Sequence, residues 1–320
     1  MTAGSHDLWR PSSGCDDDCL PPYGAVPTVS VPRRVLRLAA VAGMLLAGVG
    51  LVLLLPVLPV RERQAAVRGW ARFTARAFGV RLVIRGRLPR RRALLVANHV
   101  SWLDILAVLA VAPTRMVAKR EIRSWPVFGL LAAAAGTVFV DRARPRALPA
   151  MVGRVADTLR AGRSVAVFPE GTTWCAGAGA ADCRPGGGFR PATFQAAIDT
   201  GSPVVPLRLG YACAATGTTT TAAAFLGADT LLRSVLRVVT ARELVVSVTV
   251  AAALHPARTA DRRLLARAAE SAVHLVPAAG AATRPRLHPV PTATPAIPGV
   301  PTATPAAPPP ADGGELDLAA

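Results

Sequence analysis

The sequence predicts an α/β protein with a mostly parallel central sheet flanked by helices, preceded by an N-terminal membrane helix or a two-helix membrane anchor. From residue 81 onward, short continuous apolar runs alternate with helix-length segments, a pattern typical of parallel strands buried on both faces. Before them lies an uncharged stretch long enough to cross a bilayer. The 320 residues are 52% hydrophobic, which excludes a wholly disordered chain and provides for one sizeable core.

The first 32 residues are polar, rich in proline and glycine and without hydrophobic periodicity, so we predict a disordered arm over 1–32. Within it, Cys15 and Cys19 flank three aspartates, a pattern that can attract a metal ion. Because no paired second cluster or histidine supports such a site, we favour a flexible acidic arm. The five cysteines of the chain are an odd number and widely scattered, so they predict no disulfide framework.

A membrane anchor is predicted over 33–80. Its apolar part, 38–60, carries no charge, and at about 1.5 Å per residue it is long enough to cross ~30 Å of hydrocarbon. Pro56 and Pro59 would disrupt its last turns, and the segment 64–78 that follows has the pattern of a basic amphipathic helix in a membrane interface. Arginines flank both ends of the apolar part, so they choose no orientation, and a re-entrant helix pair is an alternative to a full span.

The α/β domain is predicted over 81–280. Its strands are expected at the apolar runs Arg81–Ile84, Ala93–Ala97, Met116–Ala118, Thr137–Val140, Ser164–Phe168, Val204–Leu209 and Val245–Val250. Its helices are expected near 101–112, 125–135, 147–161, 191–200 and 258–275. The segment 281–320 is rich in proline, alanine and threonine and repeats a six-residue motif, which predicts a disordered tail.

A histidine stands at the end of one predicted strand. His99 follows the run that ends at Ala97, and ligands of α/β sheets bind at the carboxyl ends of strands. Asp104 lies about one helical turn further, in a helix that Ser101 can cap, so its carboxylate can reach an imidazole N–H. A carboxylate so placed fixes the tautomer and leaves the other ring nitrogen free as a general base. Alone, the pattern also fits an ordinary helix start with a polar histidine.

Two further strand ends carry polar groups. The strand that ends at Phe168 is followed by Glu170, Gly171 and Thr172, whose side chains and backbone N–H groups can bind a hydroxyl or an oxyanion. Another strand ends at Arg142, whose guanidinium offers a bidentate fork to a phosphate or a carboxylate. Three strand ends that carry such groups together indicate a functional site far more specifically than any one of them does.

These blocks resemble, in order and spacing, the four motifs of the glycerolipid acyltransferase family, whose members include 1-acylglycerol-3-phosphate acyltransferases. The corresponding segments are the His-X4-Asp motif His99–Asp104, then Gly136–Arg142, Phe168–Thr172 and Val204–Leu207, with further similarity at Ala118–Glu121 and Trp125–Pro126. The resemblance covers roughly residues 80–210.

The resemblance implies a membrane-bound O-acyltransferase that transfers a fatty acyl group from acyl-CoA or acyl carrier protein to a lysolipid hydroxyl. No residue pattern suggests a cofactor or a metal, so we expect neither. The expected acceptor is 1-acyl-sn-glycerol-3-phosphate, giving phosphatidic acid. His99 would take the hydroxyl proton and Asp104 would orient His99, without a covalent acyl-enzyme. The residues implied for the acceptor are Arg142, Glu170, Gly171, Thr172, Gly136 and, for headgroup charge or the oxyanion, Lys119. Pro206 would shape the last strand near the acyl site.

One position departs from the family pattern. Thr173 stands where the family often has an arginine that helps to hold the phosphate, although Arg184 and Arg190 can substitute for it. Another acceptor, such as a lyso-ornithine lipid, therefore stays open. The insertion 174–188 contains Cys175 and Cys183, and it is either an acceptor-selecting loop or a solvent loop with incidental cysteines.

The formal charge of +18 has two readings, a nucleic-acid partner or an anionic membrane surface. The chain lacks basic runs interleaved with aromatic residues, zinc-finger spacing and a recognisable nucleic-acid module, so we expect no nucleic acid. A non-catalytic lipid-binding protein of the same fold is a third reading. We expect membrane lipids as partners and the cell membrane as location, with the catalytic domain on the cytoplasmic side.

Overall fold

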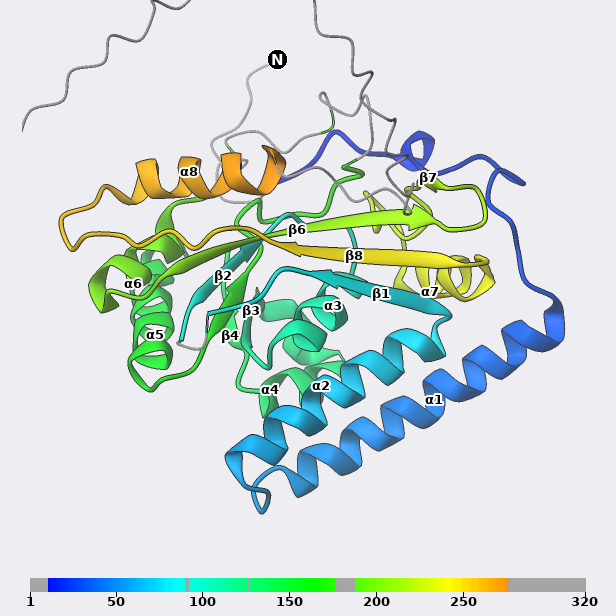
Figure 1. Cartoon of the computed structure of the whole chain (residues 1–320), viewed down its shortest axis with the longest axis horizontal. Coiled ribbons are helices and arrows are strands. Elements are labelled where there is room, and N and C mark those ends of the chain that lie inside the picture. The colour runs from blue at the N-terminus through cyan, green and yellow to red at the C-terminus, as the bar shows by residue number, and fades with distance from the viewer. Residues whose placement is uncertain (1–10, 90–91, 126, 177–182, 184–187, 276–320) are drawn as a thin grey trace, which may run out of the picture. The chain divides into compact units, whose positions relative to one another are not determined.

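A mixed eight-stranded sheet forms the centre of the computed structural model, which describes residues 11–89, 92–125, 127–176, 183 and 188–275 (Figure 1). The strands are β1 (Val80–Arg85), β2 (Leu94–Ala97), β3 (Arg115–Lys119), β4 (Val138–Val140), β5 (Val165–Val167), β6 (Val204–Cys213), β7 (Thr218–Thr219) and β8 (Leu244–Val250). Their order is β1-β8-β6-β2-β5-β3-β4, with β7 beside β6. Among the strands that the structure describes, only the pairs of β6 with β8 and with β7 are antiparallel, so the predicted mostly parallel α/β fold is confirmed.

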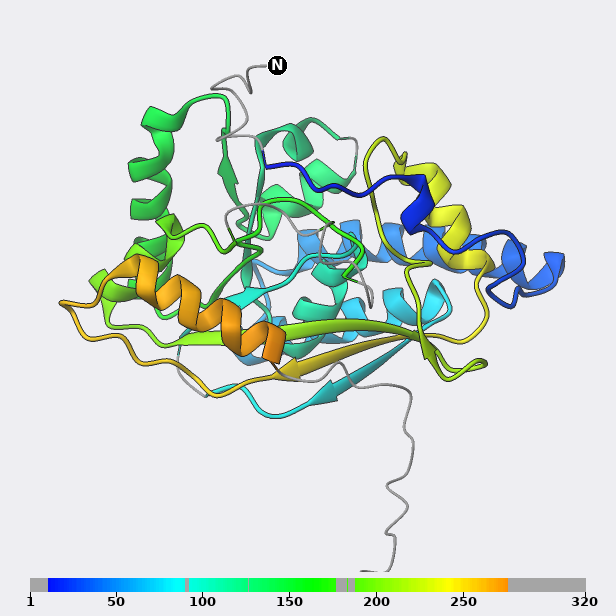
Figure 2. The ribbon, with the colours of Figure 1, turned by 90° about the horizontal axis from the view of Figure 1, so that it is seen from above.

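Helices cover both faces of the sheet (Figures 1 and 2). The helices are α1 (Val31–Leu54), α2 (Val60–Ala77), α3 (Leu103–Val111), α4 (Phe128–Ala134), α5 (Leu148–Arg160), α6 (Ala192–Thr200), α7 (Leu231–Thr240) and α8 (Arg262–Leu275), with short 3-10 turns η1 (Asp17–Cys19), η2 (Arg120–Ser124) and η3 (Pro145–Ala147). One core lies between the sheet and α2, α3 and α7, and a second lies between the sheet and α5, α6 and α8.

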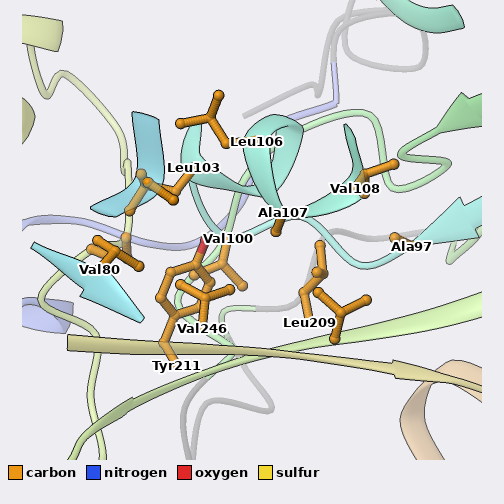
Figure 3. Packing of buried hydrophobic residues seen from close by; sticks show 14 of the residues in the cluster. Val80, Ala97, Val100, Leu103, Leu106, Ala107, Val108, Leu209, Tyr211 and Val246 are labelled. Carbon is orange, nitrogen blue, oxygen red and sulfur yellow. The ribbon is translucent and has the colours of Figure 1, made fainter. Parts of the chain in front are cut away.

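The alternation of side chains in β2 shows why its continuous apolar run forms a central strand. Leu94 and Val96 point into the core beside α5 and α6, whereas Leu95 and Ala97 point into the core beside α3. Successive side chains of a strand point to opposite faces, so a strand covered on both sides needs apolar residues at every position. Figure 3 shows α3 packed through Leu103 and Ala107 over the side chains of β6 and β8.

The first described residues, 11–30, contact the rest of the protein, although the sequence predicts a disordered arm there. Residues 11–30, which we call the strap, are packed, with Cys15 and Val29 buried. The backbone N–H of Val29 donates to the carbonyl of Thr240 at the end of α7. In Figure 1 the strap is the dark-blue segment that leads to the start of α1. Residues 11–30 thus make tertiary contacts that their composition alone does not indicate, and disorder of the arm stays a prediction; residues 1–10 and the predicted tail 281–320 lie outside the described residues.

The predicted anchor corresponds to two helices joined by a short turn. The long helix α1 is apolar enough to cross a membrane, and only 11% of its most apolar window is buried. The α1–α2 hairpin is fastened where the Trp70 indole N–H donates to the Met44 carbonyl at 2.8 Å. At the other end of α1, Arg37 donates to the carbonyls of Val239 and Ala241, both at 2.8 Å.

Two elements were not predicted from the sequence, α7 and β7. The start of α7 could have been predicted from its N-cap residue, because the Thr230 side chain accepts the backbone N–H of Arg233 at 3.2 Å. Buried Ser234 and Val238 then repeat at helical spacing. The two-residue β7 has no hydrophobic pattern and is exposed, so only its pairing with β6 defines it.

Candidate active site

The loop after β2 holds His99 at the carboxyl edge of the sheet. Asn98 fixes this loop, since its side chain is almost fully buried and both donates to the Leu209 carbonyl and accepts the Leu209 N–H, at 3.0 and 2.8 Å. His99 is thereby presented beyond the strand end, with 19% of its side chain exposed. Its ring stacks on Phe168 from the end of β5, with centroids 3.9 Å apart and planes 7° apart.

Asp104, in the first turn of α3, holds His99 in one orientation. Its Oδ2 lies 2.8 Å from His99 Nδ1 and also accepts the backbone N–H groups of Val100 and Ser101 at 2.7 and 2.9 Å. A carboxylate accepts only, so His99 carries its proton on Nδ1 and keeps a lone pair on Nε2. In the neutral imidazole, Nε2 is therefore the ring nitrogen that can accept a proton.

A tyrosine that the sequence analysis did not identify completes the Asp104 environment. Tyr211 of β6 donates its hydroxyl to Asp104 Oδ1, and Asp104 is fully buried. Burial, and then the charge of Asp104, raise the pKa of Tyr211 well above its ordinary value, so its hydroxyl stays protonated and donates. A buried carboxylate requires such donors, because water cannot solvate it.

Glu170, in the turn after β5, contacts the backbone of His99. Its carboxylate is buried, and Oε2 accepts the His99 backbone N–H at 2.8 Å, while Oε1 lies 3.5 Å from His274 Nε2 on α8. Trp174 supports the same loop by donating its backbone N–H to the His99 carbonyl at 3.1 Å. Glu170 thus holds the histidine loop, and the acceptor role implied for it by the resemblance would require its carboxylate to leave these contacts.

Gly171 and Thr172 form the turn that follows β5. Gly171 adopts a positive φ of 78°, and a Cβ there would lie 2.7 Å from Pro11 Cγ of the strap. Both the conformation and the close approach therefore require glycine. Thr172 follows half-buried at the same edge.

Three cations gather beside this turn. Lys119 ends β3 and Arg142 follows β4. Arg190 is held at the turn because its backbone N–H donates to the Pro169 carbonyl at 3.0 Å. Partial desolvation, and then the charge of Arg142, lower the pKa of Lys119; burial, and then the charge of Arg190, lower that of Arg142. Like charges held together are typical of a site for an anion. We call these residues the cation set; Arg184 lies outside the described residues.

Two residues that the resemblance implied lie away from this edge. Gly136 precedes β4 at its amino end, and a Cβ there would lie 2.7 Å from Nε of Arg115, the first residue of β3. Because β3 and β4 run parallel, this end is opposite to the one that carries Lys119 and Arg142. Pro206 is buried within β6 in register with Val96, so it lies inside the sheet rather than at its edge.

The fold and site define an α/β protein with a His–Asp pair and a cation set at the carboxyl edge of its parallel strands. The Acyltransferase family model matches residues 80–210. A lyso-ornithine lipid O-acyltransferase from Pseudomonas aeruginosa is 33% identical over 250 residues, which are 76% of this chain and 93% of that protein. The chain belongs to the acyltransferase family.

Other relatives match over shorter segments. A lyso-ornithine lipid O-acyltransferase from Rhizobium meliloti is 44% identical over 42% of this chain, and a 1-acyl-sn-glycerol-3-phosphate acyltransferase from Neisseria gonorrhoeae is 44% identical over 37% of it. These two alignments span 48% and 44% of the relatives' own length, so less than half of each. The crystal structure of the 1-acyl-sn-glycerophosphate acyltransferase PlsC from Thermotoga maritima matches with a TM-score of 0.56 and 18% identity, over 76% of this chain and 92% of that one. This last likeness supports the fold alone.

Proposed function

We propose that the protein is a lysolipid O-acyltransferase, and the observation that carries the proposal is the His99–Asp104 pair, in which Nδ1 of the partly exposed His99 is bound to buried Asp104. His99 Nε2 takes the proton of the lysolipid hydroxyl as that oxygen attacks the carbonyl carbon of a fatty acyl thioester. The tetrahedral intermediate then collapses, the C–S bond breaks, and the imidazolium returns the proton to the leaving thiolate. Asp104 stabilises the imidazolium throughout, and no acyl-enzyme forms.

For the acceptor we propose a lyso-ornithine lipid. The supporting observations are the Pseudomonas aeruginosa relative, which aligns over nearly its whole length, and Thr173 in place of an arginine. The cation set would bind the carboxylate of the ornithine headgroup through charge-assisted hydrogen bonds. Acyl-CoA or acyl carrier protein supplies the thioester.

A second acceptor, 1-acyl-sn-glycerol-3-phosphate, is supported by the cation set itself and by the Neisseria gonorrhoeae relative. Lys119, Arg142 and Arg190 offer as many positive charges as a phosphate monoester needs, with Arg190 taking the place of the arginine missing at 173. The ornithine headgroup offers the cation set a carboxylate, whereas 1-acyl-sn-glycerol-3-phosphate offers it a phosphate monoester. Assaying both acceptors side by side therefore decides between them.

We propose further that the protein acts at a membrane surface, with the α1–α2 hairpin dipping into the bilayer and returning. The support is that both ends of the hairpin are bound to the α/β domain, α1 through Arg37 and α2 through buried Ala71 and Ala75 packed beside α3. Exposed apolar side chains on α1, including Leu46, Leu53 and Leu54, would contact lipid.

The test is an acyl-transfer assay with purified full-length protein, both thioester donors and a panel of lysolipids. The wild type is expected to acylate lyso-ornithine lipid with a higher kcat/KM than 1-acyl-sn-glycerol-3-phosphate, and His99→Ala is expected to abolish transfer to either. A reversed preference would favour the second acceptor. Full activity of His99→Ala would overturn the mechanism, and lysolipid binding without any transfer would indicate a non-catalytic lipid-binding protein.

A further inference from the structure

Four of the five cysteines of the chain meet at one place. Cys15 and Cys19 belong to the strap, and Cys175 and Cys183 to the loop that follows β5. Their four Sγ atoms all lie within 4.8 Å of one another. Cys19 and Cys183 are 164 residues apart in the sequence, yet their sulfurs are 3.5 Å apart. The sequence analysis treated the two pairs separately, because nothing in the sequence indicates that the strap crosses to this loop.

We propose that these four cysteines bind one structural zinc ion. A tetrahedral site with Zn–S bonds of about 2.3 Å places its sulfurs about 3.8 Å from one another, close to the spacing of the cluster. Two disulfides would need only two close pairs, whereas here each sulfur lies near all three others, as the corners of a tetrahedron do. Four thiolates also fill the coordination of zinc and leave no position for a reacting water, which is typical of a structural site.

The surroundings suit a metal-bound thiolate group. Cys15 and Cys175 are buried, at 7% and 6% exposure, so the site is shielded on one side from solvent. The Cys175 backbone N–H donates to Cys15 Sγ at 3.2 Å, and such donors stabilise the charge on a coordinating sulfur. One Zn²⁺ with four thiolates carries a charge of −2, which a chain of net charge +18 readily offsets.

The position of the cluster gives the ion a clear role in the fold. Cys175 directly follows Trp174, whose backbone N–H donates to the His99 carbonyl, and Pro11 at the start of the strap packs against Gly171. A zinc ion would therefore link the strap to the loop that borders the candidate active site. It would supply the ordering that the polar strap cannot obtain from its own few apolar residues, as metals do in small poorly packed segments.

The experiment measures metal bound to the full-length chain, purified in detergent without a polyhistidine tag. Elemental analysis is expected to find one zinc per chain. Cys19→Ser and Cys183→Ser are each expected to lower zinc to a small fraction of that value. Cys213→Ser is the matched control, because Cys213 is buried in β6 with its thiol on the Arg242 carbonyl, outside the cluster, and it should keep its zinc.

Cobalt substitution keeps the test decisive if a serine variant fails to fold. Co²⁺ added to chelated wild-type protein is expected to give the intense visible and thiolate charge-transfer bands of a tetrahedral thiolate site, with a sharp end-point at one equivalent. Four free thiols without bound metal, two disulfides found by intact mass, or stoichiometric iron in place of zinc would each overturn the proposal. Metal content is measured without acyl transfer, so its outcome is independent of the proposed function.

Discussion

Asp104 accepts hydrogen bonds from four groups of the candidate active site. Its Oδ2 accepts from His99 Nδ1 and from the N–H groups of Val100 and Ser101, and its Oδ1 accepts from Tyr211. Two of these donors belong to the loop that precedes α3, so one carboxylate both holds this loop and orients the proposed base. The charge of this group and its hydrogen bonds can be tested separately.

Replacing Asp104 by Asn should lower kcat on the order of 10³-fold, because the amide keeps the shape of the carboxylate but cannot stabilise the imidazolium. The measurement is steady-state acyl transfer beside thermal unfolding in detergent. Asp157→Asn is the matched control, since Asp157 is an exposed carboxylate paired with Arg160 on α5. A kcat equal to that of the control would exclude Asp104 from the mechanism.

Tyr211→Phe should lower kcat about tenfold and the free energy of unfolding by about 1.5–3 kcal/mol, because a buried charge loses one hydrogen bond. A positioning role predicts that kcat per folded molecule falls while KM for donor and acceptor stays, so the folded fraction of each variant is measured beside its activity. Tyr23→Phe, on an exposed residue of the strap, should change neither quantity. Equal effects of the two variants would contradict the role of Tyr211.

The sequence could predict His99 and Asp104 because both lie within one helical turn of each other. It could not predict Tyr211, which reaches Asp104 from 107 residues away through the pairing of β6. Gly136 and Arg142 belong to the same motif, yet Gly136 precedes β4 and Arg142 follows it, so the two lie at opposite ends of the strand. Sequence spacing therefore predicts contacts between residues that are close in the chain. Contacts between distant residues depend on the order and direction of the strands, which the spacing does not give.

Among the elements, the α1–α2 hairpin depends on one close contact. A Cβ at Gly48 would lie 2.9 Å from Nε1 of Trp70, so glycine lets the two helices approach. The sequence predicted both helices from their apolar and basic patterns. It could not predict the packed strap before them, because the strap packs through contacts with α7 and with the loop after β5.

Gly48→Leu should separate α1 from α2 and lower the unfolding free energy by about 1–3 kcal/mol, the usual cost of overpacking. Thermal unfolding in detergent micelles measures this change. Gly50→Leu is a matched control on the same helix, because nothing lies within 4 Å of a Cβ there. Comparable destabilisation by the two substitutions would show that the contact with Trp70 is not what joins the hairpin.

At the scale of the whole molecule, the positive charge is spread over opposite faces. The helix α2, which carries several arginines, pairs with the apolar helix α1, whereas α8, which also carries arginines, lies on the other face of the sheet (Figure 1). If the charge serves a membrane surface, only the first group should affect lipid binding. If it reflects composition alone, the two groups should be equivalent.

Changing Arg61, Arg72 and Arg76 of α2 together to Gln should weaken binding to anionic vesicles by up to about 100-fold, since each arginine near such a surface contributes about 1 kcal/mol. Binding to zwitterionic vesicles should change little, because it depends on the apolar hairpin.

The matched control changes Arg262, Arg263 and Arg267 of α8 to Gln. These arginines are also exposed, and their replacement removes the same total charge. Vesicle flotation at low and high salt measures both variants, and the difference between them should shrink as salt screens the surface. Equal losses from the two triple variants would mean that net charge, rather than the face beside the hairpin, governs attachment to the membrane.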